Sequence, residues 1–99
     1  MSTANKNVRT AAYRAMEGKL PPAIRKLAEI VFTTFQRNPD HPALRRHQLD
    51  DMAKGRHRSG TWSVSINMKY RALYVVDGDT NVWYWVGSHN DFENFVGRK

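Results

Sequence analysis

The 99-residue sequence predicts a single α+β domain, in which two N-terminal helices pack on a small, twisted, mainly antiparallel sheet and a short helix follows. Three observations predict this class. Apolar residues recur at helical spacing before residue 38, and they alternate with polar residues from residue 62 onward. The composition, 40% hydrophobic and 25% charged, is that of an ordinary globular domain. Because the helices precede the strands instead of alternating with them, the order indicates α+β.

Two helices are predicted in the first half of the chain. Residues 1–7 are polar and are expected to be disordered. Val8, Ala12, Ala15 or Met16, and Leu20 recur at helical spacing, and Thr10 is the expected N-cap of this first helix. Pro21 and Pro22 then end one helix and begin the next, since proline is tolerated in a first turn. The second helix carries an apolar stripe made of Ile24, Leu27, Ala28, Val31 and Phe35, widened by Ile30 and Phe32.

The second half of the chain is predicted to form the sheet. A short edge strand is expected within residues 43–49, and a polar loop over 50–60. Strands are expected over 62–66, 70–76 and 81–86, where apolar residues alternate or cluster. The sequence Asp-Gly-Asp-Thr at 77–80 is a strong hairpin signal between the last two strands. A terminal helix over 91–97 is expected, capped by Asn90 or Asp91.

Strict alternation assigns the side chains of the last two strands to faces. One face is expected to hold Arg71, Leu73, Val75, Val82, Tyr84 and Val86, and the other Tyr70, Ala72, Tyr74, Trp83 and Trp85. Both faces are rich in apolar groups, and the two N-terminal helices can cover only one. We therefore expect the other face to be covered by loops, by a partner chain or by stacked bases.

The charge is concentrated in the middle of the sequence. The chain has a net charge of +7, and residues 41–71 hold seven basic and two acidic side chains. Such a segment is typical of a phosphate-binding surface, because neutralising phosphates releases condensed counterions. The alternative is a solvated basic surface that favours solubility. The candidate RNA-binding residues are Arg45, Arg46, Lys54, Arg56, Arg58 and Lys69.

Several classes of protein are excluded by composition. The chain has no cysteine, and its four histidines lack metal-ligand spacing, so we expect neither a metal site nor a cofactor. No apolar run approaches the roughly 20 residues that cross a membrane, and no apolar signal core lies near the N-terminus. The expected location is therefore the cytoplasm, without a membrane partner.

An ordered set of short motifs resembles the RelE/ParE superfamily of toxins from toxin–antitoxin systems. The motifs are Leu20-Pro21-Pro22, Asn38-Pro39-x-His41-Pro42-x-Leu44, Leu49, Trp62-Ser63, Tyr70-Arg71-Ala72-Leu73-Tyr74 and Trp83-Tyr84-Trp85-Val86-Gly87-Ser88-His89. The resemblance spans residues 8–97 and implies two helices packed on a small sheet. It also implies cleavage of messenger RNA on the ribosome and a cognate antitoxin as partner. Related members instead poison DNA gyrase, and a relative that only binds nucleic acid or protein is a third alternative.

Two residues are candidates for catalysis. Metal-free RNA cleavage needs a base, a cation on the phosphate and a proton donor for the leaving 5′-oxygen. Arg71 matches an arginine kept by nuclease members, and its planar fork suits phosphate; the alternative is a surface salt bridge. His89 matches a family histidine and can exchange protons near neutral pH; the alternative is a structural hydrogen bond. Strict alternation places the His89 side chain on the other face of the sheet from Arg71, unless the strand ends or bulges at Gly87.

The chain departs from the family pattern at three places. Phe92 lies where many nucleases of this type carry an aromatic hydroxyl, and Ser65 where many carry an arginine. The segment 42–44 lacks the glutamate that some members have there. The catalytic set implied by the resemblance is therefore incomplete. Either other residues, such as His47, His57 or a lysine, take over, or the nuclease is weak, or the target differs.

Overall fold

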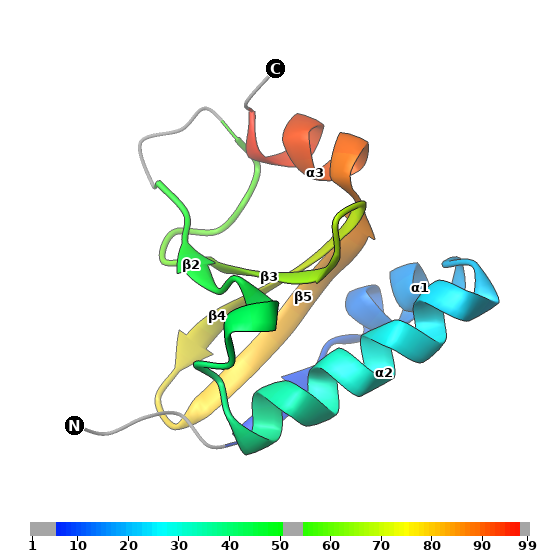
Figure 1. Cartoon of the computed structure of the whole chain (residues 1–99). Coiled ribbons are helices and arrows are strands. Elements are labelled where there is room, and N and C mark those ends of the chain that lie inside the picture. The colour runs from blue at the N-terminus through cyan, green and yellow to red at the C-terminus, as the bar shows by residue number, and fades with distance from the viewer. Residues whose placement is uncertain (1–5, 51–54, 98–99) are drawn as a thin grey trace.

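Nine elements follow one another in the computed structural model, which describes residues 6–50 and 55–97. They are β1 (Lys6–Arg9), α1 (Ala11–Gly18), α2 (Pro22–Arg37), the 3-10 turn η1 (Pro42–Leu44), β2 (His47–Gln48), β3 (Trp62–Asn67), β4 (Tyr70–Asp77), β5 (Thr80–Ser88) and α3 (His89–Val96). The strands form one sheet in the order β1-β5-β4-β3-β2, and only the β1–β5 pair is parallel. The predicted α+β class is confirmed. Figure 1 shows α1 and α2 together on one side of the sheet and α3 at the other.

The N-terminal segment differs from the expectation. Lys6 and Asn7 belong to strand β1, whereas the sequence predicted disorder over 1–7 and a helix from Val8; residues 1–5 lie outside the described part of the chain. The strand is held by tertiary contacts, since Asn7 Oδ1 accepts hydrogen bonds from Trp83 Nε1 at 3.0 Å and from the Asn81 side chain at 3.2 Å. The helix α1 starts at Ala11, after this strand, and Thr10 caps it as predicted.

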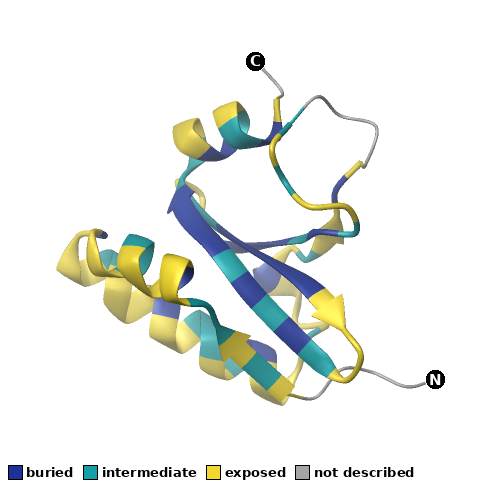
Figure 2. Cartoon of the chain, turned by 180° about the vertical axis from the view of Figure 1, so that it is seen from behind, coloured by how far each residue is buried: buried dark blue, intermediate teal, exposed yellow. Residues whose placement is uncertain are grey.

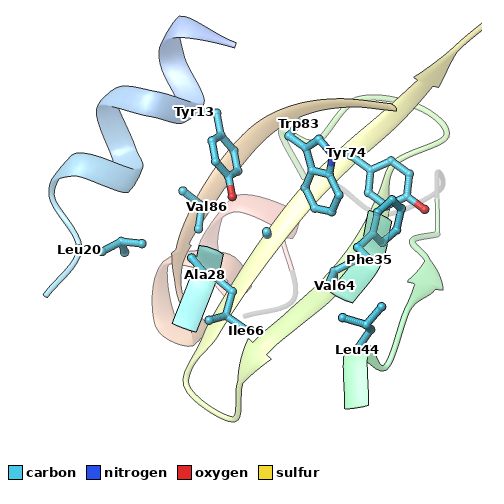
Figure 3. Close-up of a cluster of buried hydrophobic side chains, with 11 residues drawn as sticks. Tyr13, Leu20, Ala28, Phe35, Leu44, Val64, Ile66, Tyr74, Trp83 and Val86 are labelled. Atoms are coloured by element: carbon cyan, nitrogen blue, oxygen red, sulfur yellow. The ribbon is translucent and has the colours of Figure 1, made fainter. Parts of the chain in front are cut away.

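The core between α2 and the sheet is built from aromatic side chains (Figure 3). Phe35 meets the rings of Trp83 and Tyr74 edge-on, with centroids 5.0 and 5.2 Å apart. Such edge-to-face pairs add to the free energy gained from burial. The apolar stripe of α2 is narrower than predicted, because Leu27 and Ile30 are 37% and 56% exposed. Only the side of α2 that faces the sheet is buried.

A bulge in β5 reverses the predicted faces beyond Tyr84. Trp83 is opposite Tyr74 and Trp85 is opposite Leu73, so Tyr84 is the extra residue. A bulge shifts alternation by one position, which the sequence pattern does not reveal. The prediction is therefore wrong for Trp85, which packs with Leu73, and for Val86, which joins the core under α1 and α2.

The second face of the sheet is covered by the chain itself. Leu49, Leu73, Trp85, Phe92 and Val96 form a second buried cluster beneath α3. Figure 2 shows the central strands buried along most of their length and exposed at the β4–β5 hairpin. Of the expected covers, which were loops, a partner chain or stacked bases, neither a partner nor bases are needed, because α3 and Leu49 of the same chain pack on this face. The helix α3 starts at His89, before the expected start at Asp91, and the Ser88 hydroxyl caps it in place of the expected Asn90 or Asp91.

The remaining segments match the expectation in part. The segment expected to form an edge strand contains η1 and the two-residue strand β2, which is the outermost strand beside β3. Within residues 6–50 and 55–97, no helix has the length and apolar character needed to cross a membrane.

Candidate functional site

The candidate site lies where the β3–β4 turn, the end of η1 and the start of α3 meet. Arg71 is the second residue of β4 and is half-buried. Its Nη1 donates hydrogen bonds to the carbonyl oxygens of Asn67 at 2.6 Å and Tyr70 at 3.0 Å. These contacts fix the guanidinium against the turn. Arg71 is therefore not the surface salt bridge of the alternative interpretation, but a positioned cation.

A second cation lies close to the first. Arg45 follows η1 and adopts φ 47°, in the left-handed region that is unfavourable for a residue with a side chain. Burial of the Arg71 guanidinium and the nearby Arg45 cation lower the pKa of Arg71 below the ordinary arginine value, and the Glu93 carboxylate acts in the opposite direction. Two like charges held together lose repulsion when an anion binds between them.

An open hollow adjoins this pair of arginines. Its volume is about 310 Å³, and it is lined by Ala43, Arg45, Ser65, Asn67 and Met68. Ser65 is directly opposite Arg71 in the β3–β4 register. A backbone phosphate in the hollow would therefore meet the Arg45 cation and would lie beside the strand position that carries Arg71.

His89 is brought to the same end of the sheet. It is the first residue of α3, and its backbone N–H donates to the Lys69 carbonyl oxygen at 2.6 Å. Its ring Nε2 is 4.0 Å from Glu93 Oε1. The predicted separation of His89 from Arg71 rested on strict alternation. The bulge at Tyr84 and the helical conformation from His89 onward remove that premise.

Glu93 is the residue that the sequence analysis missed. It lies one helical turn after His89, and its side chain is 27% exposed. Its carboxylate is close enough to Arg71 to act on the pKa of that group. The signal in the sequence was the four-residue spacing between His89 and Glu93, which is visible only if the helix is taken to begin at His89.

The other basic candidates fall into two groups. Arg46 is bound within the fold: it pairs with Asp40 at 2.6 Å, donates to the Tyr74 hydroxyl at 3.2 Å and lies 4.8 Å from the centre of the Trp62 ring. Exposed basic side chains that remain available to a ligand are Arg45, Arg56, Arg58 and Lys69. Lys54 lies outside the described residues.

Two of the three places at which the chain departs from the family pattern, Phe92 and Ser65, are buried. Phe92 is 2% exposed within the cluster beneath α3, so it cannot stack on a base. Ser65 is 8% exposed and lies at the hollow that Arg45 also lines. Among the described residues, no three His, Asp or Glu side chains are grouped so that they could hold a metal ion.

Comparison with known proteins supplies the family. The model of the ParE-like toxin domain matches residues 22–94. No curated protein sequence matches the chain. Among solved structures, the RelBE2 toxin–antitoxin complex of Mycobacterium tuberculosis is similar at 28% identity and a TM-score of 0.57, covering 88% of this chain and 100% of the other.

Two further structures share the fold at lower identity. The YoeB/ParE toxin from Agrobacterium tumefaciens is 21% identical, with a TM-score of 0.61 over 85% of this chain and 98% of the other. YafQ from Escherichia coli is 8% identical, with a TM-score of 0.63 over 89% of this chain and 97% of the other. These likenesses confirm the fold that the sequence motifs implied.

Proposed function

The chain belongs to the ParE-like toxin domain family, within the RelE/ParE superfamily of toxin–antitoxin toxins, and from this premise we propose that it is an endoribonuclease that cleaves messenger RNA on the ribosome. The observation that carries the proposal is the positioned Arg71 guanidinium, which has the Arg45 cation near it and lies at the end of the sheet where His89 begins α3. A phosphate cradle next to a proton-transfer group is what phosphodiester cleavage requires.

The proposed chemistry follows from this arrangement. The RNA 2′-oxygen attacks the adjacent phosphorus after losing its proton, and the bond from phosphorus to the 5′-oxygen breaks. Arg71 and Arg45 stabilise the extra negative charge on the phosphoryl oxygens, because preorganised donors stabilise charge that develops in the transition state. His89 exchanges a proton with one of the two reacting oxygens.

The proposed RNA path extends from the hollow across the exposed basic side chains. Lys69 adjoins His89 through the backbone contact at the β3–β4 turn, and Arg56 and Arg58 lie over the rings of Phe95 and Tyr84 on the α3 side. These residues contribute phosphate contacts that position RNA without reading its sequence. The proposal places the protein in the cytoplasm, where the ribosome and messenger RNA are its targets.

A cognate antitoxin is the second proposed partner. The Mycobacterium tuberculosis structure is a toxin–antitoxin complex, and so is the RelB–RelE complex of Methanococcus jannaschii, which is 17% identical with a TM-score of 0.61. Since the sheet is covered by α3, we propose that the antitoxin neutralises the surface around Arg45 and Arg71 and does not fill a gap in the core.

A gyrase-directed toxin of the same fold is the alternative. It is favoured by the description of the matching family and by Phe92, which is buried and has no hydroxyl to offer to a phosphate. Expression in cells from a tight promoter, with messenger 5′ ends and DNA breaks mapped together, separates the two functions. Cleavage within codons supports the nuclease, DNA breaks with intact messages support the gyrase toxin, and neither effect leaves a binding module.

The variant that tests the proposed site is Arg71→Ala. Loss of one preorganised donor is expected to slow cleavage by roughly 10² to 10³-fold. Arg71→Lys is expected to restore little, because an ammonium group cannot reproduce the bidentate fork. Arg25→Ala is the matched control, since Arg25 is an exposed arginine on α2. Equal toxicity of Arg71→Ala and the parent at equal expression would contradict the nuclease proposal.

A further inference from the structure

We infer that Glu93 is a positioning residue, which holds the His89 imidazole as the proton donor to the leaving 5′-oxygen. The inference rests on the proposed ribonuclease function and deepens it, because it assigns one of the two proton transfers to a particular ring nitrogen. Glu93 also supplies a carboxylate to the site. It comes from α3, whereas some relatives have a glutamate near the segment that corresponds to 42–44.

The geometry of Glu93 is the first argument. Its Oε1 is 4.0 Å from His89 Nε2, and the two residues are separated by one turn of α3. Its Oε2 is buried and has no hydrogen-bond partner among the described residues. A buried carboxylate oxygen without a partner is costly, so a stabilising interaction for its charge must come from nearby cations.

The surrounding charges are the second argument. Arg71 from β4 acts on Glu93 through space, but its Nη1 is committed to the backbone carbonyls of the turn. Arg45, which follows η1, lies close enough to Arg71 to act on its pKa, and Asp91 is an exposed carboxylate in the first turn of α3. Within the described part of the chain, His89 is the one side chain that lies within ion-pair distance of Glu93, at 4.0 Å, and the pair is charged when the imidazole is protonated.

The division of roles follows from which nitrogen faces the carboxylate. Glu93 Oε1 lies on the Nε2 side of the imidazole, so Nδ1–H of the protonated ring is left for the substrate. In the reaction, hydroxide takes the proton of the 2′-hydroxyl, and the 2′-oxygen forms a bond to phosphorus. The bond from phosphorus to the 5′-oxygen breaks, and that oxygen takes the Nδ1 proton. The products are a 2′,3′-cyclic phosphate and a 5′-hydroxyl, and His89 is left neutral with Nε2–H still facing Glu93.

The test compares two leaving groups on programmed ribosomes in single turnover. One message carries the natural phosphodiester at the cleavage site, and the other carries sulfur in place of the 5′-oxygen. A thiolate leaves without being protonated, because it is a far weaker base than an alkoxide. Glu93→Gln and His89→Gln are expected to slow cleavage of the natural message by about 10- to 100-fold. On the sulfur message, both variants are expected to remain within about 3-fold of the parent.

Three controls make the result specific. Asp91→Asn removes a carboxylate from the same helix and is expected to match the parent on both messages. The double variant Glu93→Gln/His89→Gln is expected to be no slower than His89→Gln alone, because residues that act through one another are not additive. Glu93→Asp keeps the charge but shortens its reach, so it is expected to behave like Glu93→Gln, and it replaces that variant if Glu93→Gln fails to fold.

The failures of the two proposals are distinguishable. If the parent cleaves neither message, the ribonuclease function is wrong and the inference about Glu93 is wrong with it. If the parent cleaves both messages but Glu93→Gln slows both equally, or slows neither, the ribonuclease function stands and the inference alone is overturned.

Discussion

The hydroxyl of Tyr84 is expected to determine how firmly residues 58–61 are held on the sheet. Tyr84 is the bulge residue of β5, and its oxygen accepts a hydrogen bond from the Arg58 backbone N–H at 2.9 Å. The Thr61 hydroxyl donates to the Arg58 carbonyl oxygen at 2.5 Å, so the 2.7 Å contact between Tyr84 and Thr61 must be donated by Tyr84. The result is a closed ring of three hydrogen bonds that joins residues 58–61 to the sheet.

The change Tyr84→Phe removes two of these bonds and leaves the ring of the side chain in place. Each hydrogen bond contributes about 0.5–1.5 kcal/mol net, so the free energy of unfolding is expected to fall by about 1–3 kcal/mol. For a domain of this size, the corresponding fall in Tm is on the order of 10 °C. The Thr61 side chain is fully buried, which places the expected loss above the lower end of the range.

Two measurements test this expectation. Urea unfolding followed by tryptophan fluorescence gives the loss of stability, and amide hydrogen exchange gives the protection of the Arg58 N–H. The matched control is Tyr74→Phe, which removes a single 3.2 Å hydrogen bond from Arg46 on the other face of the sheet and is expected to leave the Arg58 amide unchanged. The reasoning is refuted if Tyr84→Phe costs less than about 0.5 kcal/mol and the Arg58 amide exchanges as it does in the parent.

Two further predictions concern pH and salt. Burial raises the pKa of the Tyr13 hydroxyl above its usual value, so this group loses its proton at a lower pH in the unfolded chain than in the folded one, and stability falls as the pH rises above about 10. Tyr13→Phe is expected to make this decline shallower in unfolding measurements between about pH 9 and 11.5. Parallel stability curves for the variant and the parent would contradict this. If Arg56 and Arg58 each contact one phosphate, reversing both charges is expected to reduce the slope of log K for RNA binding against log salt concentration by about 1.4. Reversing the charges of Arg14 and Arg25, which are exposed on helices, is expected to leave this slope unchanged. Equal effects from both pairs would show that only the net charge matters.

The elements that the sequence predicted are those with a local cause. The helix α2 follows from its apolar spacing and from Pro22 in its first turn, and the β4–β5 hairpin follows from the turn at Gly78, where φ is 63°. Thr10 as a cap likewise depends only on the residues next to it. Each of these signals lies within a few residues of the feature that it predicts.

The features that the sequence did not predict depend on distant contacts. β1 exists because Asn7 and its neighbours meet β5, and four polar or mixed residues carry no strand pattern of their own. The bulge at Tyr84 is stabilised by Arg58 and Thr61, which are more than 20 residues away in the chain. Glu93 joins His89 on one face of α3 because Ser88 caps this helix, in place of the candidate caps Asn90 and Asp91.

The pairing of β1 with β5 also determines the order in which the molecule can assemble. Residues 6–9 leave the ribosome well before their partners at 80–83, because residues 10–79 lie between the two segments. Contacts of such sequence separation form late, because the intervening chain must be closed into a loop. The helix α1 is tied to the same event through the Thr10 N–H, which donates to the Trp83 carbonyl oxygen. His89 and Glu93 leave the ribosome after β5, so the candidate site cannot form before these residues have emerged.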